Sequence, residues 1–123
     1  IEVSFQDVSE LLEKTELDYA LTTYKAENLL QGFLFPSVID FYIKEYDREK
    51  WLEMIEKKGL IGGGNTRIRL TDEHVFYGLK KIQGFYTVSI PQLILDLRLE
   101  GGPCKEAAMK MIDKYHRSEE NGI

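Results

Sequence analysis

The sequence predicts an α+β fold, in which a small mixed, mostly antiparallel sheet of about four strands packs with about five helices, two of them C-terminal. Segments with apolar residues at helical spacing alternate with short segments of period two. Gly, Pro and Asn mark the breaks between them. Of the 123 residues 43% are apolar, enough for one core without disulfides or metal, so we expect a single domain spanning 1–123.

The first part of the chain is expected to alternate between helix and strand. Val8, Leu11 and Leu12 lie at helical spacing among charged residues, which predicts a short amphipathic helix near the start of the chain. A brief extended piece follows at 19–21. Thr22 or Thr23 can then cap a second helix, which ends near Gly32 and should bury one face.

The next unit combines a strand with a helix. Residues 37–44 alternate between an apolar face and a face that carries Asp40 and Tyr42, which predicts a strand partly covered on both sides. Asp47 is a suitable N-cap for a helix over 48–58. We therefore expect helix packing on one face of this strand.

Short strands are expected to follow. Gly59 should stop the preceding helix, residues 62–65 form a glycine-rich turn, and Thr66–Leu70 alternates as a half-exposed strand. Two more strands are expected at His74–Tyr77 and Phe85–Val88, on either side of a polar connector. Together these segments predict a mostly antiparallel meander.

The last part of the chain has the pattern of two helices. Ser89 and Gln92 have the N-cap to N3 spacing of a capping box, and the helix that they begin should run to about Leu99. Pro103 opens a final amphipathic helix. Residues from Ser118 onward are a polar tail that we expect to fray.

Composition limits the function classes. The 16 basic and 21 acidic residues give a net charge of -5, which disfavours autonomous binding to a phosphate backbone. Cys104 is the one cysteine in the sequence and cannot form an internal disulfide, and no apolar run is long enough to cross a bilayer. We expect a cytoplasmic protein with no membrane association. Because the chain begins with Ile1, we also expect it to be part of a longer protein.

Metal and nucleotide chemistry is weakly indicated. The triple glycine lacks the Lys-Ser/Thr pair of a P-loop and precedes a predicted strand, so a simple loop is favoured. Asp40 and Asp47 lack the same-face spacing of a Mg²⁺ pair, although Asp40 keeps a nucleotide-binding or nucleotidyltransferase-like domain open as the alternative. His74 and His116 show no zinc spacing. We expect no metal and no cofactor.

A structural role is favoured for Cys104 and for a set of four cationic residues. Cys104 lies on the apolar stripe of its helix, which favours a small buried residue over a reactive thiol. A basic patch for phosphate or an acidic protein surface is possible, but a solvated, aggregation-resistant strand face is favoured. Its residues would be Arg67, Arg69, Lys80 and Lys81.

Asp96 has the least ordinary context in the sequence. It lies in the strongly apolar segment 93–99, within a helix that must be largely buried. Two structural roles are open: a narrow polar stripe shared with Gln92, or a buried anchor that is hydrogen-bonded to backbone. Either role is favoured over catalysis, because no nucleophile or base motif accompanies this carboxylate.

The order of several segments resembles a known family. Tyr19-Ala20-Leu21-Thr22 leads into a helix that contains Ala26, and the strands at 38–43 and 75–77 follow. Val88-Ser89 then begins a segment in which Gln92-Leu93 and Asp96-Leu97 precede Gly-Gly and an Ala-rich helix. Over about residues 17 to 115, this order is similar to the C-terminal domain of AbiEi-type antitoxins, which belong to type IV toxin–antitoxin systems of abortive infection.

The resemblance implies a regulatory function. In that family an N-terminal winged helix-turn-helix domain binds operator DNA, and the C-terminal domain contributes to repression and carries antitoxin activity. We expect the DNA-reading domain upstream of Ile1, so that DNA is a partner only through that domain. Ser89, Gln92 and Asp96 match the family motif, with structural roles favoured over ligand binding, and the family implies no catalytic residues.

The sequence therefore predicts a non-enzymatic regulatory or effector domain of a transcriptional regulator or AbiEi-like antitoxin. It should act through protein contacts, either with another protein or in a homo-oligomer. A plain dimerisation module would instead show an exposed apolar stripe on the last helix.

Overall fold

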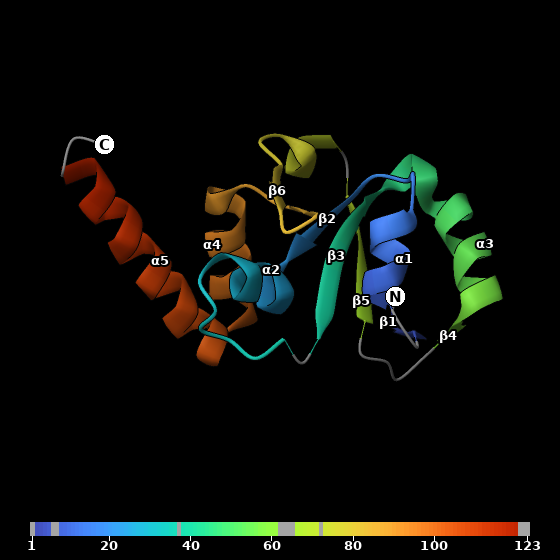
Figure 1. The fold of residues 1–123 in the computed structure, drawn as a ribbon, viewed down its shortest axis with the longest axis horizontal. Coiled ribbons are helices and arrows are strands. Elements are labelled where there is room, and N and C mark those ends of the chain that lie inside the picture. Colours follow the sequence, from blue (N-terminus) through green and yellow to red (C-terminus); the bar gives the residue numbers. More distant parts are fainter. Residues whose placement is uncertain (1, 6–7, 37, 62–65, 72, 121–123) are drawn as a thin grey trace.

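A mixed seven-stranded sheet lies at the centre of the computed structural model, which describes residues 2–5, 8–36, 38–61, 66–71 and 73–120 (Figure 1). The fold is α+β, as the sequence predicts. Its strands are β1 (Glu2–Phe5), β2 (Tyr19–Thr22), β3 (Ile39–Lys44), β4 (Gly59–Ile61), β5 (Thr66–Thr71), β6 (Lys80–Ile82) and β7 (Phe85–Thr87).

Five α-helices and two 3₁₀ turns connect and cover these strands. They are α1 (Val8–Lys14), α2 (Thr23–Leu30), η1 (Glu45–Asp47), α3 (Arg48–Lys58), η2 (Glu73–Phe76), α4 (Ile90–Glu100) and α5 (Pro103–Glu120). Figure 1 shows α2, α4 and α5 on one side of the sheet and α1 and α3 on the other. None of the helices in the described residues is long and apolar enough to cross a membrane.

The strand order is β4-β1-β5-β3-β2-β7-β6. At its centre β3 and β5 are parallel, from the pair Ile39 and Thr66 to the pair Lys44 and Thr71. A further parallel pair joins Leu21 of β2 to Thr87 of β7, and the other neighbours are antiparallel. The expected mixed sheet is present and most of its pairings are antiparallel, but the expected number of about four strands is wrong, because the described residues contain more. The central pairing of β3 with β5 is parallel.

The parallel pairing of β3 and β5 follows from the connection between them. Two parallel strands need a crossover that returns the chain to the end of the sheet where the first strand begins. Here η1, α3 and β4 form this crossover. The sequence shows the strand-then-helix pattern, but it does not show that β5 pairs in parallel with β3. Strands β1, β4 and β6, which the sequence analysis does not predict, have only three or four residues each.

Several local expectations need correction. His74–Tyr77 was expected to be a strand, but its first three residues belong to η2, where only Val75 is buried. Three adjacent apolar residues without alternation do not specify a strand. The connector before β7 contains β6, which pairs with it as a hairpin, and Gly59 opens β4 directly after α3.

Two other expectations concern the end of the chain and the glycine-rich turn. The tail expected to fray from Ser118 is still helical to Glu120. The glycine-rich turn at 62–65 lies outside the described residues.

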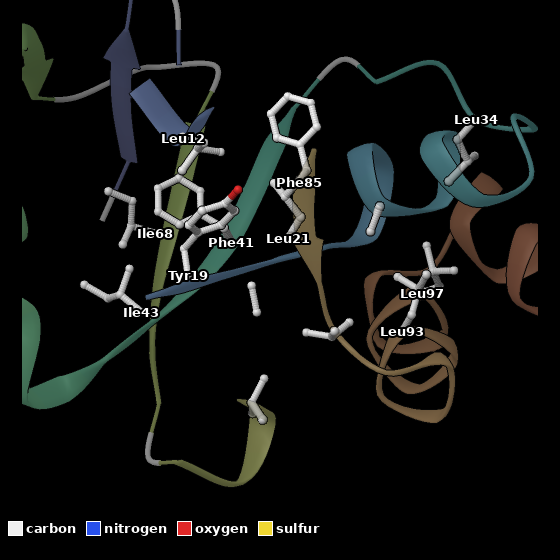
Figure 2. Close-up of a cluster of buried hydrophobic side chains, with 14 of the residues drawn as sticks. Leu12, Tyr19, Leu21, Leu34, Phe41, Ile43, Ile68, Phe85, Leu93 and Leu97 are labelled. Carbon is white, nitrogen blue, oxygen red and sulfur yellow. The ribbon is translucent and has the colours of Figure 1, made fainter. Parts of the chain in front are cut away.

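The core has two parts. On the side of α1 and α3, Phe41 makes a tilted contact with Trp51 at 5.4 Å between ring centroids and an edge contact with Tyr19 at 6.3 Å. On the other side, Leu93 and Leu97 of α4 are fully buried (Figure 2). Aromatic and aliphatic side chains thus pack on both sides of the sheet.

Candidate functional site

The N-terminus of α4 is built by the motif residues. Ser89 accepts a hydrogen bond on its hydroxyl oxygen from the backbone N–H of Gln92, at 3.4 Å, and Pro91 lies in the first turn. This confirms the predicted Ser89 cap. The Gln92 side chain does not complete a capping box, because its amide donates to Asp96 at 3.0 Å, one turn further along the helix.

Asp96 is buried, with 3% of its surface exposed. Its carboxylate accepts hydrogen bonds from the Thr22 hydroxyl at 2.6 Å, the Tyr42 hydroxyl at 2.9 Å and the Gln92 amide. The donors are side chains rather than the backbone that one interpretation invoked. Three donors replace the water that this carboxylate loses on burial, so Asp96 anchors α4 to β2 and β3.

Tyr42 is suited to its role as a donor. Burial first, and the charge of Asp96 second, raise the pKa of Tyr42 to about 12. The phenol therefore keeps its proton at neutral pH and can donate it to the carboxylate.

A second buried carboxylate lies beside the first. Asp40 has no exposed surface and accepts from the Thr23 hydroxyl at 3.0 Å. Arg69 binds it with a two-pronged contact, Nε to Oδ1 at 2.8 Å and Nη2 to Oδ2 at 2.6 Å, and Arg67 adds a bond of 3.0 Å. Such paired bonds fix geometry as well as charge, which makes Asp40 a link between β3 and β5.

Glu100 extends this arrangement to the end of α4. Both of its oxygens accept from Arg67 Nη2, at 3.1 and 3.0 Å, and Arg69 approaches one of them at 3.6 Å. Burial alone would lower the pKa of Arg69, but the hydrogen bond and charge of Asp40 outweigh burial and raise it. Asp40 and Glu100 thus balance the charges of Arg67 and Arg69, although Arg67 Nε is buried without a hydrogen-bond partner.

Gln92, Asp96 and Glu100 recur every four residues and form one polar stripe along α4. The stripe faces the polar side chains of β2, β3 and β5, and Arg69 also lies over the Tyr42 ring, 5.7 Å from its centroid. We call this set the polar seam: Thr22, Thr23, Asp40, Tyr42, Arg67, Arg69, Gln92, Asp96 and Glu100.

Adjacent threonines join the two halves of the polar seam. Thr22 donates to Asp96, whereas Thr23 donates to Asp40. Thr23 has a φ of 47°, which is a strained conformation for a β-branched residue. The strain sits where the chain turns from β2 into α2, and the hydrogen bond to Asp40 holds Thr23 in that conformation.

The four cations of the suggested basic patch do not meet. Arg67 and Arg69 lie on one face of β5, as predicted, but both are engaged by Asp40 and Glu100. Lys80 and Lys81 lie on β6, with β3, β2 and β7 between them and β5. Lys81 contacts the ring of Tyr86, 5.4 Å from its centroid.

The residues weighed as metal ligands have other surroundings. Asp40 belongs to the polar seam, and Asp47 follows the opposite end of β3, where it directly precedes α3. Within the described ranges, no group of three or more His, Cys, Asp or Glu residues is placed to hold a metal ion. His74 is exposed, and the side chain of His116 lies outside the described residues.

Cys104 is buried in the core, as its place on the apolar stripe predicts. Burial raises the pKa of the Cys104 thiol, and a hydrogen bond with Tyr24 opposes this effect. The thiol is therefore a packing residue rather than a poised nucleophile.

Sequence reasoning missed Thr22, Thr23, Tyr42 and Glu100 as partners of the motif residues. One signal could have revealed Glu100: it continues the four-residue spacing of Gln92 and Asp96 in an otherwise apolar helix. No comparable local signal exists for the threonines, because their partners are distant in the chain.

Comparison with known proteins adds no family assignment: no family model matches the chain, and neither a curated protein nor a solved structure shows significant similarity to it.

Proposed function

We propose that this chain is a non-enzymatic regulatory or effector domain, of the kind found at the C-terminus of AbiEi-type antitoxins, and that it acts by contacting another protein. The proposal rests on the observation that the motif residues have structural roles. Ser89 caps α4, Asp96 docks the helix onto the sheet, and Gln92 donates to Asp96 from within the helix. The motif therefore maintains an architecture, and recognition is left to the surface.

Charge supports a division of labour with a DNA-binding domain. The chain carries a net charge of -5, and the arginines of the polar seam are neutralised by Asp40 and Glu100. A surface of this kind repels a phosphate backbone. In the proposed arrangement operator DNA is read by a winged-helix domain that precedes this one in the full protein.

The burial of Asp40 argues against the nucleotidyltransferase-like alternative. A Mg²⁺ ligand in such a site needs a carboxylate that is open to water and to substrate phosphates. Asp40 instead has no exposed surface and accepts four hydrogen bonds from Thr23, Arg67 and Arg69. Freeing its oxygens for a metal would leave Arg69 without its main partner and Arg67 with Glu100 alone.

Co-expression tests the antitoxin form of the proposal. The gene that neighbours the coding sequence is induced in a bacterial host, either alone or together with this chain. We expect growth arrest by the neighbour and relief when the chain is present. Arrest that persists in the presence of a soluble, folded chain contradicts the proposal.

A second measurement tests the enzymatic alternative. Isothermal titration with ATP, GTP, CTP and UTP in the presence of Mg²⁺ should give no saturable heat. Saturable nucleotide binding that disappears in Asp40→Ala, in a variant still folded by circular dichroism, would favour a nucleotide-binding domain instead.

A further inference from the structure

A groove of about 540 Å³ lies between the segment that joins α1 to β2 and the β6–β7 hairpin. One wall is the end of α1 and the segment leading to β2, residues 12–19, and the other is Leu79 with the β6–β7 hairpin. Figure 1 shows these two segments at the same end of the sheet. Its volume is within the range of about 300–1,000 Å³ that is typical of ligand sites.

Part of the lining is aromatic and aliphatic, and we call Leu17, Tyr19, Leu79 and Tyr86 the floor of the groove. The hydroxyl of Tyr19 accepts a hydrogen bond from the backbone N–H of Tyr86 at 3.3 Å, and the two rings meet edge to face at 5.8 Å. Tyr86 is 42% exposed, and Leu17 and Leu79 are partly exposed beside it. Apolar side chains that are held in place but incompletely covered offer contact area at little entropic cost.

The rim of the groove is acidic. Glu13, Glu16 and Asp18 line it, against Lys81 on the hairpin. Asp18 pairs with Lys44 at 3.0 Å, whereas nearby Lys14 pairs with Glu10. Across the described part of the chain, Glu13 and Glu16 have no ion-pair partner, so their charges remain available to an incoming cation.

We propose that this groove binds a basic segment of a partner protein, in which Lys or Arg side chains flank an apolar anchor. Glu13 and Glu16 meet the cations, and the floor around Tyr86 receives the apolar side chain. A nucleic acid or an anionic lipid surface is disfavoured, because the rim would repel its phosphates. This inference rests on the part of the proposed function that gives the domain a protein partner, and it names the surface concerned.

The test uses a short peptide of alternating lysine and leucine, titrated to millimolar concentration into the isotopically labelled chain. Amide chemical shifts report where it binds. We expect saturable shifts concentrated in residues 12–19 and 79–86, weaker at high salt. A glutamate–leucine peptide and a lysine–serine peptide should both bind far more weakly, because each lacks one of the two elements. No saturable shift at the groove, or equal binding of the control peptides, overturns the proposal.

A matched pair of charge reversals separates the groove from net charge. Glu13→Lys with Glu16→Lys removes the acidic rim, and a lysine at position 13 suits the C-terminal turn of α1. Glu53→Lys with Glu56→Lys makes the same change in net charge on the exposed surface of α3. We expect about a tenfold rise in the dissociation constant of the peptide for the first variant and less than about threefold for the second. Equal effects overturn the proposal.

Three outcomes separate the identity of the partner from the proposed function. If sedimentation shows a dimer that Glu13→Lys with Glu16→Lys dissociates, the occupant is a second copy of the chain and the peptide proposal is overturned. If co-expression relieves growth arrest but the peptide does not bind the groove, only the groove assignment is contradicted. Peptide binding without relief supports the groove and contradicts the antitoxin function.

Discussion

Arg69 binds Asp40 through two parallel hydrogen bonds, of 2.8 and 2.6 Å, between neighbouring parallel strands. The carboxylate has no exposed surface, whereas 31% of the Arg69 side chain remains exposed. Because Arg67 and Thr23 donate to the same carboxylate, one buried charge organises β3, β5 and the start of α2. The stability of the sheet should therefore depend strongly on Asp40.

Removing this carboxylate should be costly. Asp40→Ala leaves two partly buried guanidinium groups with Glu100, and for Arg69 also the Tyr42 ring, as partners, and we expect a loss of about 3–5 kcal/mol in the free energy of unfolding. Urea denaturation measures it. The matched control is Asp18→Ala, whose exposed pair with Lys44 should contribute about 0–1 kcal/mol. Similar losses for the two variants would show that the buried pair has no special role.

The hydroxyl of Tyr42 offers a finer test of how α4 is anchored. Tyr42→Phe keeps the ring but removes one of the three donors to buried Asp96, so we expect a loss of about 1–3 kcal/mol in the free energy of unfolding. Tyr77→Phe, at a side chain that is 72% exposed, should change it by less than about 0.5 kcal/mol. A neutral result for Tyr42→Phe would mean that Thr22 and Gln92 suffice to satisfy the carboxylate.

Whether the sequence alone reveals a feature depends on how far apart along the chain its residues lie. Ser89 and Gly101 bracket α4 through local capping chemistry, so the limits of this helix are predictable from neighbouring residues. The contact of Asp40 with Arg69 depends on the register of β3 and β5, which a long crossover sets. The sequence shows that Arg67 and Arg69 alternate with apolar residues on β5, but it does not show that both bind Asp40. From the sequence alone, the two arginines therefore resemble an exposed basic patch.

Strain at Thr23 predicts an unusual ranking of variants. Thr23→Ala and Thr23→Gly both remove the hydrogen bond to Asp40, but only glycine relieves the positive φ of 47°. We therefore expect the glycine variant to be more stable than the alanine variant by about 1 kcal/mol, although glycine is usually about 1 kcal/mol worse than alanine in a helix. Thermal unfolding of both variants measures the difference. The ordinary helix ranking, with alanine the more stable, would show that the backbone at this position is not strained.

Alkaline pH should weaken the contact between Tyr42 and Asp96. The pKa of Tyr42 is about 12 in the folded protein, against 10.0 for an unperturbed tyrosine. Because the folded state holds this proton more tightly, the stabilisation is fully present below about pH 10 and is lost as the pH rises towards 12. The difference in unfolding free energy between the native chain and Tyr42→Phe should accordingly shrink above that pH. Comparing the two proteins cancels the titration of the other tyrosines, and a difference that stays constant up to pH 12 would show that the Tyr42 proton is not held by folding.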